Sequence, residues 1–201
     1  TAAIDEPRFD HYPDTGKSRG LLFEGVARTN IALWNRDLTN AIWSKSRTTI
    51  SANFGVAPNG ATEIDKVIEN TETNVHALVQ TVAYDGASYY IMHGFFRAAG
   101  RDWIRLVLPN AAFSGVSPSG YFNLATGTLG TFSNATMYGI RQIGDTDIYE
   151  CWVGGLSDVA ISSTLSFQMA TGDGTNNYAG DGSSGIEMWG IGCYALTDIS
   201  I

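Results

Sequence analysis

The sequence predicts an all-β protein, a β-sandwich of the jelly-roll type, and three observations support this fold class. Glycine contributes 23 of the 201 residues, well above its usual share of about 7%. Charged residues make up only 16% of the chain, against about 25% in a typical domain. Short apolar runs alternate with turn-forming residues along the chain, and no segment has a convincing helical period.

The opening residues predict an extended arm, so we divide the chain into an arm over 1–30 and a sandwich domain over 31–201. Residues 13–16 predict a turn within the arm, and Leu21–Glu24 predicts a short strand. An extended segment can pair with the edge of another chain's sheet, and we therefore expect the arm to dock on a neighbouring subunit. The arm residues suited to such a contact are Arg8, Phe9 and Tyr12.

The strands of the predicted sandwich are apolar runs bounded by turn residues. They are Ile31–Asn35, Ile64–Glu69, His76–Tyr84, Tyr89–Ala98, Trp103–Leu108, Gly120–Leu124, Met137–Ile143, Ile148–Val153, Thr164–Met169 and Ile186–Tyr194. The dipeptides Asp85-Gly86 and Pro109-Asn110 are typical of the turns between them. A repeating solenoid is the rival all-β architecture, but the chain has no fixed period.

The charge of the chain disfavours nucleic acid and anionic membranes as partners. Its formal net charge is −8, whereas contact with a phosphate backbone needs a basic face. No apolar run reaches the length of about 18 residues that a membrane-spanning helix needs, so we expect no membrane insertion. The chain begins at Thr1 rather than at a methionine, and we expect it to be a fragment or a trimmed product.

No pattern in the sequence predicts a cofactor. Gly180–Gly185 has the spacing of a dinucleotide-binding loop, but the residues after it favour a strand rather than the required helix. We therefore interpret it as a hairpin turn. The glycine-rich residues 172–185 provide only Asp173 and Asp181 as charged oxygen ligands, and we favour turn chemistry there over a structural calcium site.

Neither the cysteines nor the acidic residues predict a catalytic centre. Cys151 and Cys193 lie in apolar runs, and we favour buried free thiols over a disulfide between them. Glycoside hydrolysis needs two carboxylates that face each other across the substrate, and no spacing brings acids such as Asp145 and Glu150 together. We therefore expect no catalytic residues and no enzymatic activity.

Aromatic and basic side chains on outward strand faces are the candidate carbohydrate-binding residues. Alternation along residues 101–108 places three aliphatic side chains on one face and Arg101, Trp103 and Arg105 on the other. A tryptophan can stack on a sugar ring, and guanidinium groups can bind hydroxyls or carboxylates. The alternative is a core tryptophan, or an Arg–Trp contact within the chain. The same alternation gives further candidates on other strands, which are Tyr89, His93, Arg97 and Trp152. The structural alternative, a core position or a contact within the chain, is favoured for Trp103, and also for Trp34, Trp43 and Trp189.

Several segments resemble, in the same order along the chain, a family of tailed-bacteriophage virion proteins. They are Pro7–Gly16 (PRFDHYPDTG), Arg19–Glu24 (RGLLFE), Ala27–Asn30 (ARTN), Tyr121–Gly130 (YFNLATGTLG), Ile148–Cys151 (IYEC) and Tyr178–Ile186 (YAGDGSSGI). Together these segments extend over nearly the whole chain. The chain departs from the family pattern at Trp152, where a small polar residue is usual, and in the final strand near Cys193.

This resemblance implies a jelly-roll domain similar to carbohydrate-binding modules, carried on the virion surface by a tail fibre, a tail tip or a head-decoration protein. It implies other virion proteins as partners, a homo-oligomer that is usually a trimer, and no catalysis. It also implies that Cys151 is a strand residue rather than half of a required disulfide. The shared motifs are turns and core strands, so no sugar-contacting residue follows from them.

Two functions from different classes are compatible with the sequence. The first is a non-enzymatic virion structural protein, a surface module for adhesion to host glycan or for decoration of the particle. The alternative is a carbohydrate-binding module of a polysaccharide-degrading enzyme, which the neighbouring genes would reveal. A third hypothesis, a domain that itself acts on glycans, would be tested by the substitutions Glu150→Gln and Asp145→Asn.

Overall fold

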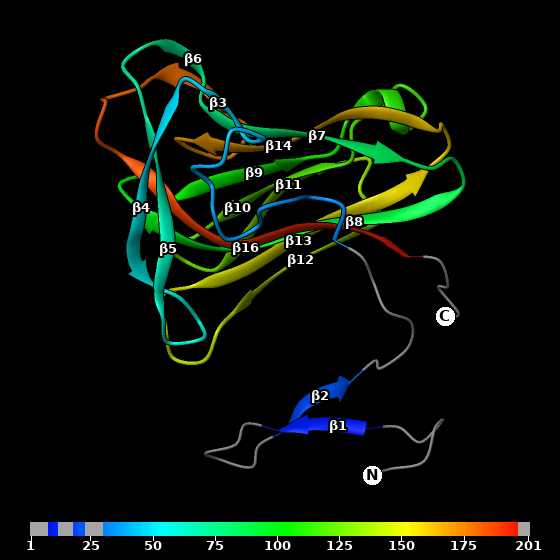
Figure 1. The fold of residues 1–201 in the computed structure, drawn as a ribbon, viewed down its shortest axis with the longest axis horizontal. Coiled ribbons are helices and arrows are strands. Elements are labelled where there is room, and N and C mark those ends of the chain that lie inside the picture. The colour runs from blue at the N-terminus through cyan, green and yellow to red at the C-terminus, as the bar shows by residue number, and fades with distance from the viewer. Residues whose placement is uncertain (1–7, 12–17, 23–29, 197–201) are drawn as a thin grey trace.

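The computed structural model describes residues 8–11, 18–22 and 30–196, and most of this chain folds into two six-stranded antiparallel sheets packed face to face (Figure 1). The β9 sheet contains, in spatial order, β11 (Thr128–Ser133), β10 (Ser119–Asn123), β9 (Trp103–Val107), β14 (Ile161–Ala170), β7 (Ala77–Tyr84) and β3 (Ser44–Ser46). The β8 sheet contains β12 (Met137–Gln142), β13 (Tyr149–Ser157), β8 (Ser88–Ala99), β16 (Gly185–Leu196), β5 (Thr62–Glu69) and β4 (Thr48–Val56). Two short strands, β6 (Thr73–Val75) and β15 (Asn177–Ala179), pair beside the sheets, and a 3₁₀ turn, η1, spans Asn110–Ala112.

The connections between the two sheets follow the jelly-roll order. Within the β8 sheet the strands run β5-β16-β8-β13, and within the β9 sheet they run β7-β14-β9-β10. Successive strands of these eight cross between the sheets, except that β9 is followed by its neighbour β10 in the same sheet. This is the pattern of two Greek keys that defines an eight-stranded jelly roll. Strands β3, β4, β11 and β12 extend the two sheets at their edges. The predicted fold class is confirmed.

The core lies between the two sheets because apolar and polar residues alternate along most strands. In β9, Ile104 and Leu106 are buried, whereas the residues between them are half-buried on the outer face. Phe167 on β14 is fully buried, and its ring centroid lies 5.9 Å from that of Phe96 on the opposite sheet. It also lies 6.2 Å from the ring centroid of Trp43. Aromatic contacts of this kind join the two layers.

The predicted strand Ile31–Asn35 is wrong, because two side chains take hydrogen bonds that would build it. The Gln80 side chain accepts from the backbone N–H of Leu33 at 2.7 Å and donates to the Leu33 carbonyl at 3.0 Å. The Asn30 side chain accepts from the backbone N–H of Cys193 at 2.9 Å and from that of Ala32 at 3.0 Å. Its amide donates to the Ile191 carbonyl. Only one bridge to β16 results, and the chain then turns away through Trp34, which has a left-handed φ of 55°.

The arm is a hairpin rather than a single extended segment. Strands β1 (Arg8–His11) and β2 (Ser18–Leu22) pair antiparallel, with Phe9 opposite Leu21. Within the described residues, neither strand pairs with a strand of the sandwich. Tyr12, the expected turn over 13–16 and the last two residues of the predicted strand Leu21–Glu24 lie outside the described residues. The division of the chain at residue 30 stays a prediction.

The two cysteines are free and buried, as predicted. They lie on β13 and β16, the two strands that flank β8. Burial raises the pKa of Cys193 to about 12 and that of Cys151 well above its ordinary value, so both thiols are protonated and unreactive at neutral pH. Among residues 8–11, 18–22 and 30–196, no helix is long and apolar enough to cross a membrane.

Candidate functional site

The structure divides the predicted carbohydrate-binding residues between the two outer faces of the sandwich. Trp103 and Arg105 project from β9 on the outer face of the β9 sheet. The outer face of the β8 sheet carries Tyr89, His93 and Arg97 from β8, and Trp152 from β13. These two groups lie on opposite sides of the molecule and cannot form a single site.

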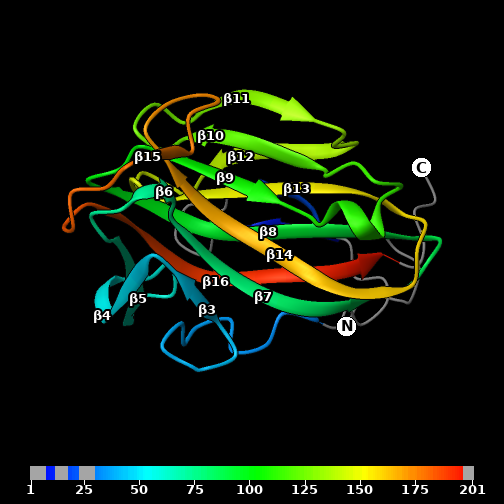
Figure 2. The ribbon, with the colours of Figure 1, turned by 90° about the horizontal axis from the view of Figure 1, so that it is seen from above.

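Strand pairing surrounds Trp103 and Arg105 with residues from both neighbouring strands. Arg105 lies between Tyr121 on β10 and Gln168 on β14, and Trp103 lies in the adjacent row beside Asn123 of β10. Because side chains two residues apart on a strand share a face, these two rows present one continuous outer surface. Figure 2 looks onto this sheet, with β14, β9 and β10 side by side.

A polar network holds the Arg105 side chain in place. Its Nη2 donates to Ser119 Oγ at 3.2 Å and its Nη1 donates to Gln168 Oε1 at 3.4 Å, while the guanidinium lies 5.2 Å from the ring centroid of Tyr121. The Asn176 amide donates to Gln168 Oε1 at 2.7 Å and accepts from Tyr121 Oη at 3.2 Å. The five residues Trp103, Arg105, Tyr121, Gln168 and Asn176 are called the platform below.

The loop between β14 and β15 contributes Asn176 to the platform and reaches strand β11 (Figure 2). In this loop Asp173 accepts hydrogen bonds from the backbone N–H and the hydroxyl of Thr131 on β11, at 2.8 and 2.9 Å. A Cβ atom on Gly130 would lie 2.7 Å from Trp103 Cζ3 and 2.7 Å from Asp173 Oδ1. The absence of a side chain at Gly130 therefore lets the indole and the loop close over β11.

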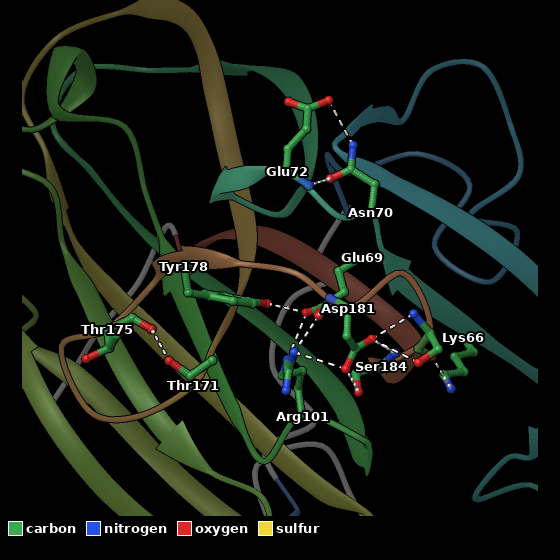
Figure 3. A network of polar contacts seen from close by, with 11 residues as sticks. Lys66, Glu69, Asn70, Glu72, Arg101, Thr171, Thr175, Tyr178, Asp181 and Ser184 are labelled. Atoms are coloured by element: carbon green, nitrogen blue, oxygen red, sulfur yellow. Dashed lines mark hydrogen bonds and ion pairs between the residues drawn. The ribbon is translucent and has the colours of Figure 1, made fainter.

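Arg101, predicted to share the outward face with Trp103, is instead part of a separate network (Figure 3). Its guanidinium donates from Nε and Nη2 to the carboxylate of Glu69, whose side chain is completely buried. Tyr178 Oη and the backbone N–H of Asp181 donate to the same carboxylate at 2.6 and 2.8 Å. Arg101 is thus a structural residue, because its donors are used within the chain before β9 begins.

The contacts of Glu69 keep it ionised in the interior. Burial alone would raise the pKa of this carboxyl, but the hydrogen bonds from Arg101, Tyr178 and Asp181 and the charge of Arg101 outweigh it. The pKa of Glu69 therefore lies below its ordinary value. The ionised form stabilises the fold at neutral pH, and this contribution is lost as the pH falls through the lowered pKa.

The two aspartates considered for calcium hold turns together. Asp181 accepts from the backbone N–H and hydroxyl groups of Ser183 and Ser184, and these bonds lower the pKa of its carboxyl. They confirm that Gly180–Gly185 is a turn leading into β16. The prediction of a hairpin turn is wrong, because β15 pairs with β6 and β16 pairs with β5 and β8. Within the described ranges, no group of three or more His, Cys, Asp or Glu side chains could hold a metal. The absence of a cofactor stays a prediction.

Arginine and carboxylate side chains on the outer face of the β8 sheet are paired with one another. His93 Nδ1 lies 3.7 Å from Glu150 Oε1, and Arg141 binds the other oxygen of this carboxylate. Burial lowers the pKa of His93, although Glu150 opposes the shift. Arg97 binds Glu187 and also lies 3.6 Å from Asp147. The arginines of this face are therefore paired within the chain, although His93 Nδ1 and Trp189 Nε1 have no hydrogen-bond partner among the described residues. We take the platform as the candidate binding site because its arginine, Arg105, has no carboxylate partner among the described residues.

Sequence reasoning identified only part of the platform. It selected Trp103 and Arg105 from the alternation of one strand but did not select Tyr121, Gln168 or Asn176. No alternation of burial along β10 marks Tyr121, because residues 119–122 are all buried and Tyr121 itself is only 8% exposed. A second miss lies elsewhere, because Trp34, predicted to be in the core, is 57% exposed.

The sequence matches no protein-family model and no curated protein. Among solved structures, the chain is similar to the enzymatically active domain of tailspike protein 4 of bacteriophage CBA120, with a TM-score of 0.47 and 9% sequence identity. The similarity covers 83% of this chain and 21% of that chain, so this chain spans about a fifth of the length of the tailspike domain.

This comparison corrects one expectation from the sequence. The sequence predicts that the chain is not an enzyme, whereas the tailspike domain to which it is similar is described as enzymatically active. The expectation that the chain lacks enzymatic activity is therefore withdrawn as wrong.

Proposed function

We propose that this chain is a surface module of a bacteriophage virion that binds a host-cell glycan through the platform. The observation that supports this function is the row of side chains around Trp103 and Arg105 on the outer face of the β9 sheet. An indole offers a flat apolar surface to the C–H face of a sugar ring. The neighbouring guanidinium and amides offer donors and acceptors for its hydroxyl groups.

The platform is preorganised for such a ligand. Gln168 and Asn176 are fixed by a mutual hydrogen bond, and Tyr121 is fixed by Asn176. Burial raises the pKa of Tyr121, so its hydroxyl remains a neutral donor and acceptor at neutral pH. Side chains that are already held in place lose little conformational entropy when a ligand arrives, which favours affinity.

The assignment to a virion rests on the sequence resemblance, whose segments follow the same order as in tailed-bacteriophage virion proteins. The partners proposed on this basis are other capsid or tail proteins and further copies of this chain, most simply in a trimer on the particle surface. The hairpin of β1 and β2 supports a docking role, because its outer edges are unpaired within the described residues. We propose that Arg8 and Phe9 on β1, together with Tyr12, contact a neighbouring subunit.

Removal of the Trp103 indole is expected to weaken glycan binding by about tenfold or more, because a stacked aromatic anchor typically contributes over 1 kcal/mol. The measurement is binding of Trp103→Ala and the unmodified chain to host cells and to their purified surface polysaccharide. Trp34→Ala is the matched control, because Trp34 is an exposed tryptophan outside the platform. Unchanged affinity of Trp103→Ala would show that the glycan binds elsewhere on the chain. Absence of binding by the unmodified chain would refute glycan recognition.

Deletion of residues 1–29 is expected to leave a folded sandwich that is not incorporated into virions. The described hairpin makes no strand pairing with the sandwich, so its loss removes no ladder hydrogen bonds from either sheet. Thermal unfolding would verify the fold of the shortened chain, and virions produced with it would be analysed for its presence. Full incorporation of the shortened chain would contradict a docking role for the arm.

A further inference from the structure

We propose that the glycan bound at the platform is acidic, and that Arg105 binds its carboxylate while Trp103 stacks on the ring of the same sugar. This inference rests on the proposed glycan binding and adds the chemical class of the ligand. The source of the carboxylate is either a uronic acid or a sialic-acid-like sugar, since both present the same group to a guanidinium.

The first observation is the isolation of Arg105 from acidic side chains. Among the described residues, Arg105 forms no ion pair with a carboxylate. Every other arginine of residues 30–196 has at least one carboxylate partner, and these arginines are Arg36, Arg47, Arg97, Arg101 and Arg141. The chain has 20 acidic and 12 basic residues, so the isolation of Arg105 does not result from a shortage of carboxylates.

The second observation is that Arg105 is held in place but incompletely satisfied. Its two hydrogen bonds, to Ser119 and Gln168, are long and go to neutral oxygens. A guanidinium has five N–H donors. The Nε of Arg105 is buried without a partner, so the charge is incompletely compensated within the chain and a ligand would be bound by the Nη groups. A carboxylate is the acceptor whose two oxygens match two guanidinium N–H groups at once. The fixed guanidinium is therefore better suited to an anion than to another neutral hydroxyl.

The third observation is the distance between the two anchors. Trp103 and Arg105 are two residues apart on one strand face, a separation of about 6.5 Å along the strand. A pyranose stacked on the indole can direct its exocyclic carboxylate to the guanidinium in the next row. One acidic sugar would then engage both residues.

One negative charge opposes such a ligand. Asp173 lies in the loop beside the platform, fixed by Thr131. The charge of Asp173 acts to raise the pKa of Tyr121, whereas the charge of Arg105 acts to lower it, so both charges lie close to the same phenol. Replacing Asp173 with asparagine keeps an acceptor for Thr131 and removes the repulsion, so this variant is expected to bind an acidic glycan several-fold more tightly.

The test compares each glycan with its carboxyl-reduced form, in which every carboxylate is converted to an alcohol. The probes are the host surface polysaccharide, polygalacturonate as a uronic acid polymer, and polysialic acid. For the unmodified chain, reduction is expected to weaken binding of at least one probe by tenfold or more. Arg105→Gln is expected to bind the native and the reduced forms of that probe equally weakly, because it no longer distinguishes carboxylate from alcohol.

Arg47→Gln is the matched control, since it removes the same charge from a half-buried arginine outside the platform that pairs with Glu72. It should keep the full preference for the native glycan. Equal binding of native and reduced polysaccharide by the unmodified chain would overturn the acidic ligand while leaving glycan binding intact. A preference for the native glycan that persists in Arg105→Gln would overturn the role of Arg105 while leaving glycan binding intact. Failure of the unmodified chain to bind any polysaccharide would overturn both the acidic ligand and the proposed glycan binding. Unfolding temperatures of the variants separate these outcomes from misfolding.

Discussion

Replacing Arg101 with alanine is expected to destabilise the sandwich by about 3–5 kcal/mol, because it leaves a buried carboxylate without its cation. The Glu69 side chain has no exposed surface, and Arg101 is its ion-pair partner. Tyr178 and the Asp181 backbone would still donate to it, but neither neutralises its charge. For a chain of this length, such a loss corresponds to a fall in Tm of about 6–20 °C.

Thermal and urea unfolding of three variants would test this expectation. Arg47→Ala removes an arginine whose ion pair with Glu72 is exposed to solvent, and it should cost less than about 1 kcal/mol. The double variant Arg101→Ala/Glu69→Gln should be more stable than Arg101→Ala alone, because the uncompensated charge is gone. Equal destabilisation by Arg101→Ala and Arg47→Ala would show that the buried pair has no special role.

Phe167→Ala is the second substitution with a large expected effect, a loss of about 3–5 kcal/mol in the free energy of unfolding. Phe167 is fully buried at the contact between the two sheets. Its ring meets Phe96 of the opposite sheet and Trp43 of the loop before β3. Truncation removes these contacts and leaves a cavity that a jelly roll closed by two rigid sheets can fill only partly.

Urea unfolding of Phe167→Ala and Phe54→Ala would separate core packing from a general effect of losing a phenyl ring. Phe54 is 53% exposed on β4, and its truncation should change stability by about 0.5 kcal/mol or less. Phe167→Leu should fall between the two, since leucine fills part of the same space. A Phe167→Ala variant as stable as Phe54→Ala would mean that the interior is not closely packed at this position.

The fold class could be predicted because most strands obey a strict alternation. In β9, for example, the buried positions Ile104 and Leu106 are both aliphatic, and turn residues mark both ends of the strand. Strand β4 was missed because its residues are mainly small and polar, and its pairing with β5 is broken by a bulge between Ser51 and Gly55. The residues after Ile31 are apolar, but hydrogen bonds from the side chains of Asn30 and Gln80 take the place of strand pairing there.

The candidate site could be predicted only within one strand. The residue that supports Arg105 from β14, Gln168, is 63 positions away in sequence, and Ser119 is 14 positions away. Arg101 shows that alternation along one strand can also assign a residue to the wrong neighbours. Alternation placed it beside Trp103, but its true partner, Glu69, lies 32 positions earlier. Alternation determines which face a residue occupies, whereas strand order and loop paths determine what it meets there.

Under the proposed function, in which the chain links a virion to a cell, the position of Asn30 has a mechanical consequence. The chain joins the sandwich where Asn30 bridges β16 in the β8 sheet, whereas the platform lies on the far side of the β9 sheet. Tension between a captured glycan and the arm would therefore run across the interior and pull the two layers apart, rather than shear the hydrogen bonds along a strand. The force that the attachment withstands would then depend on the apolar contacts between the layers.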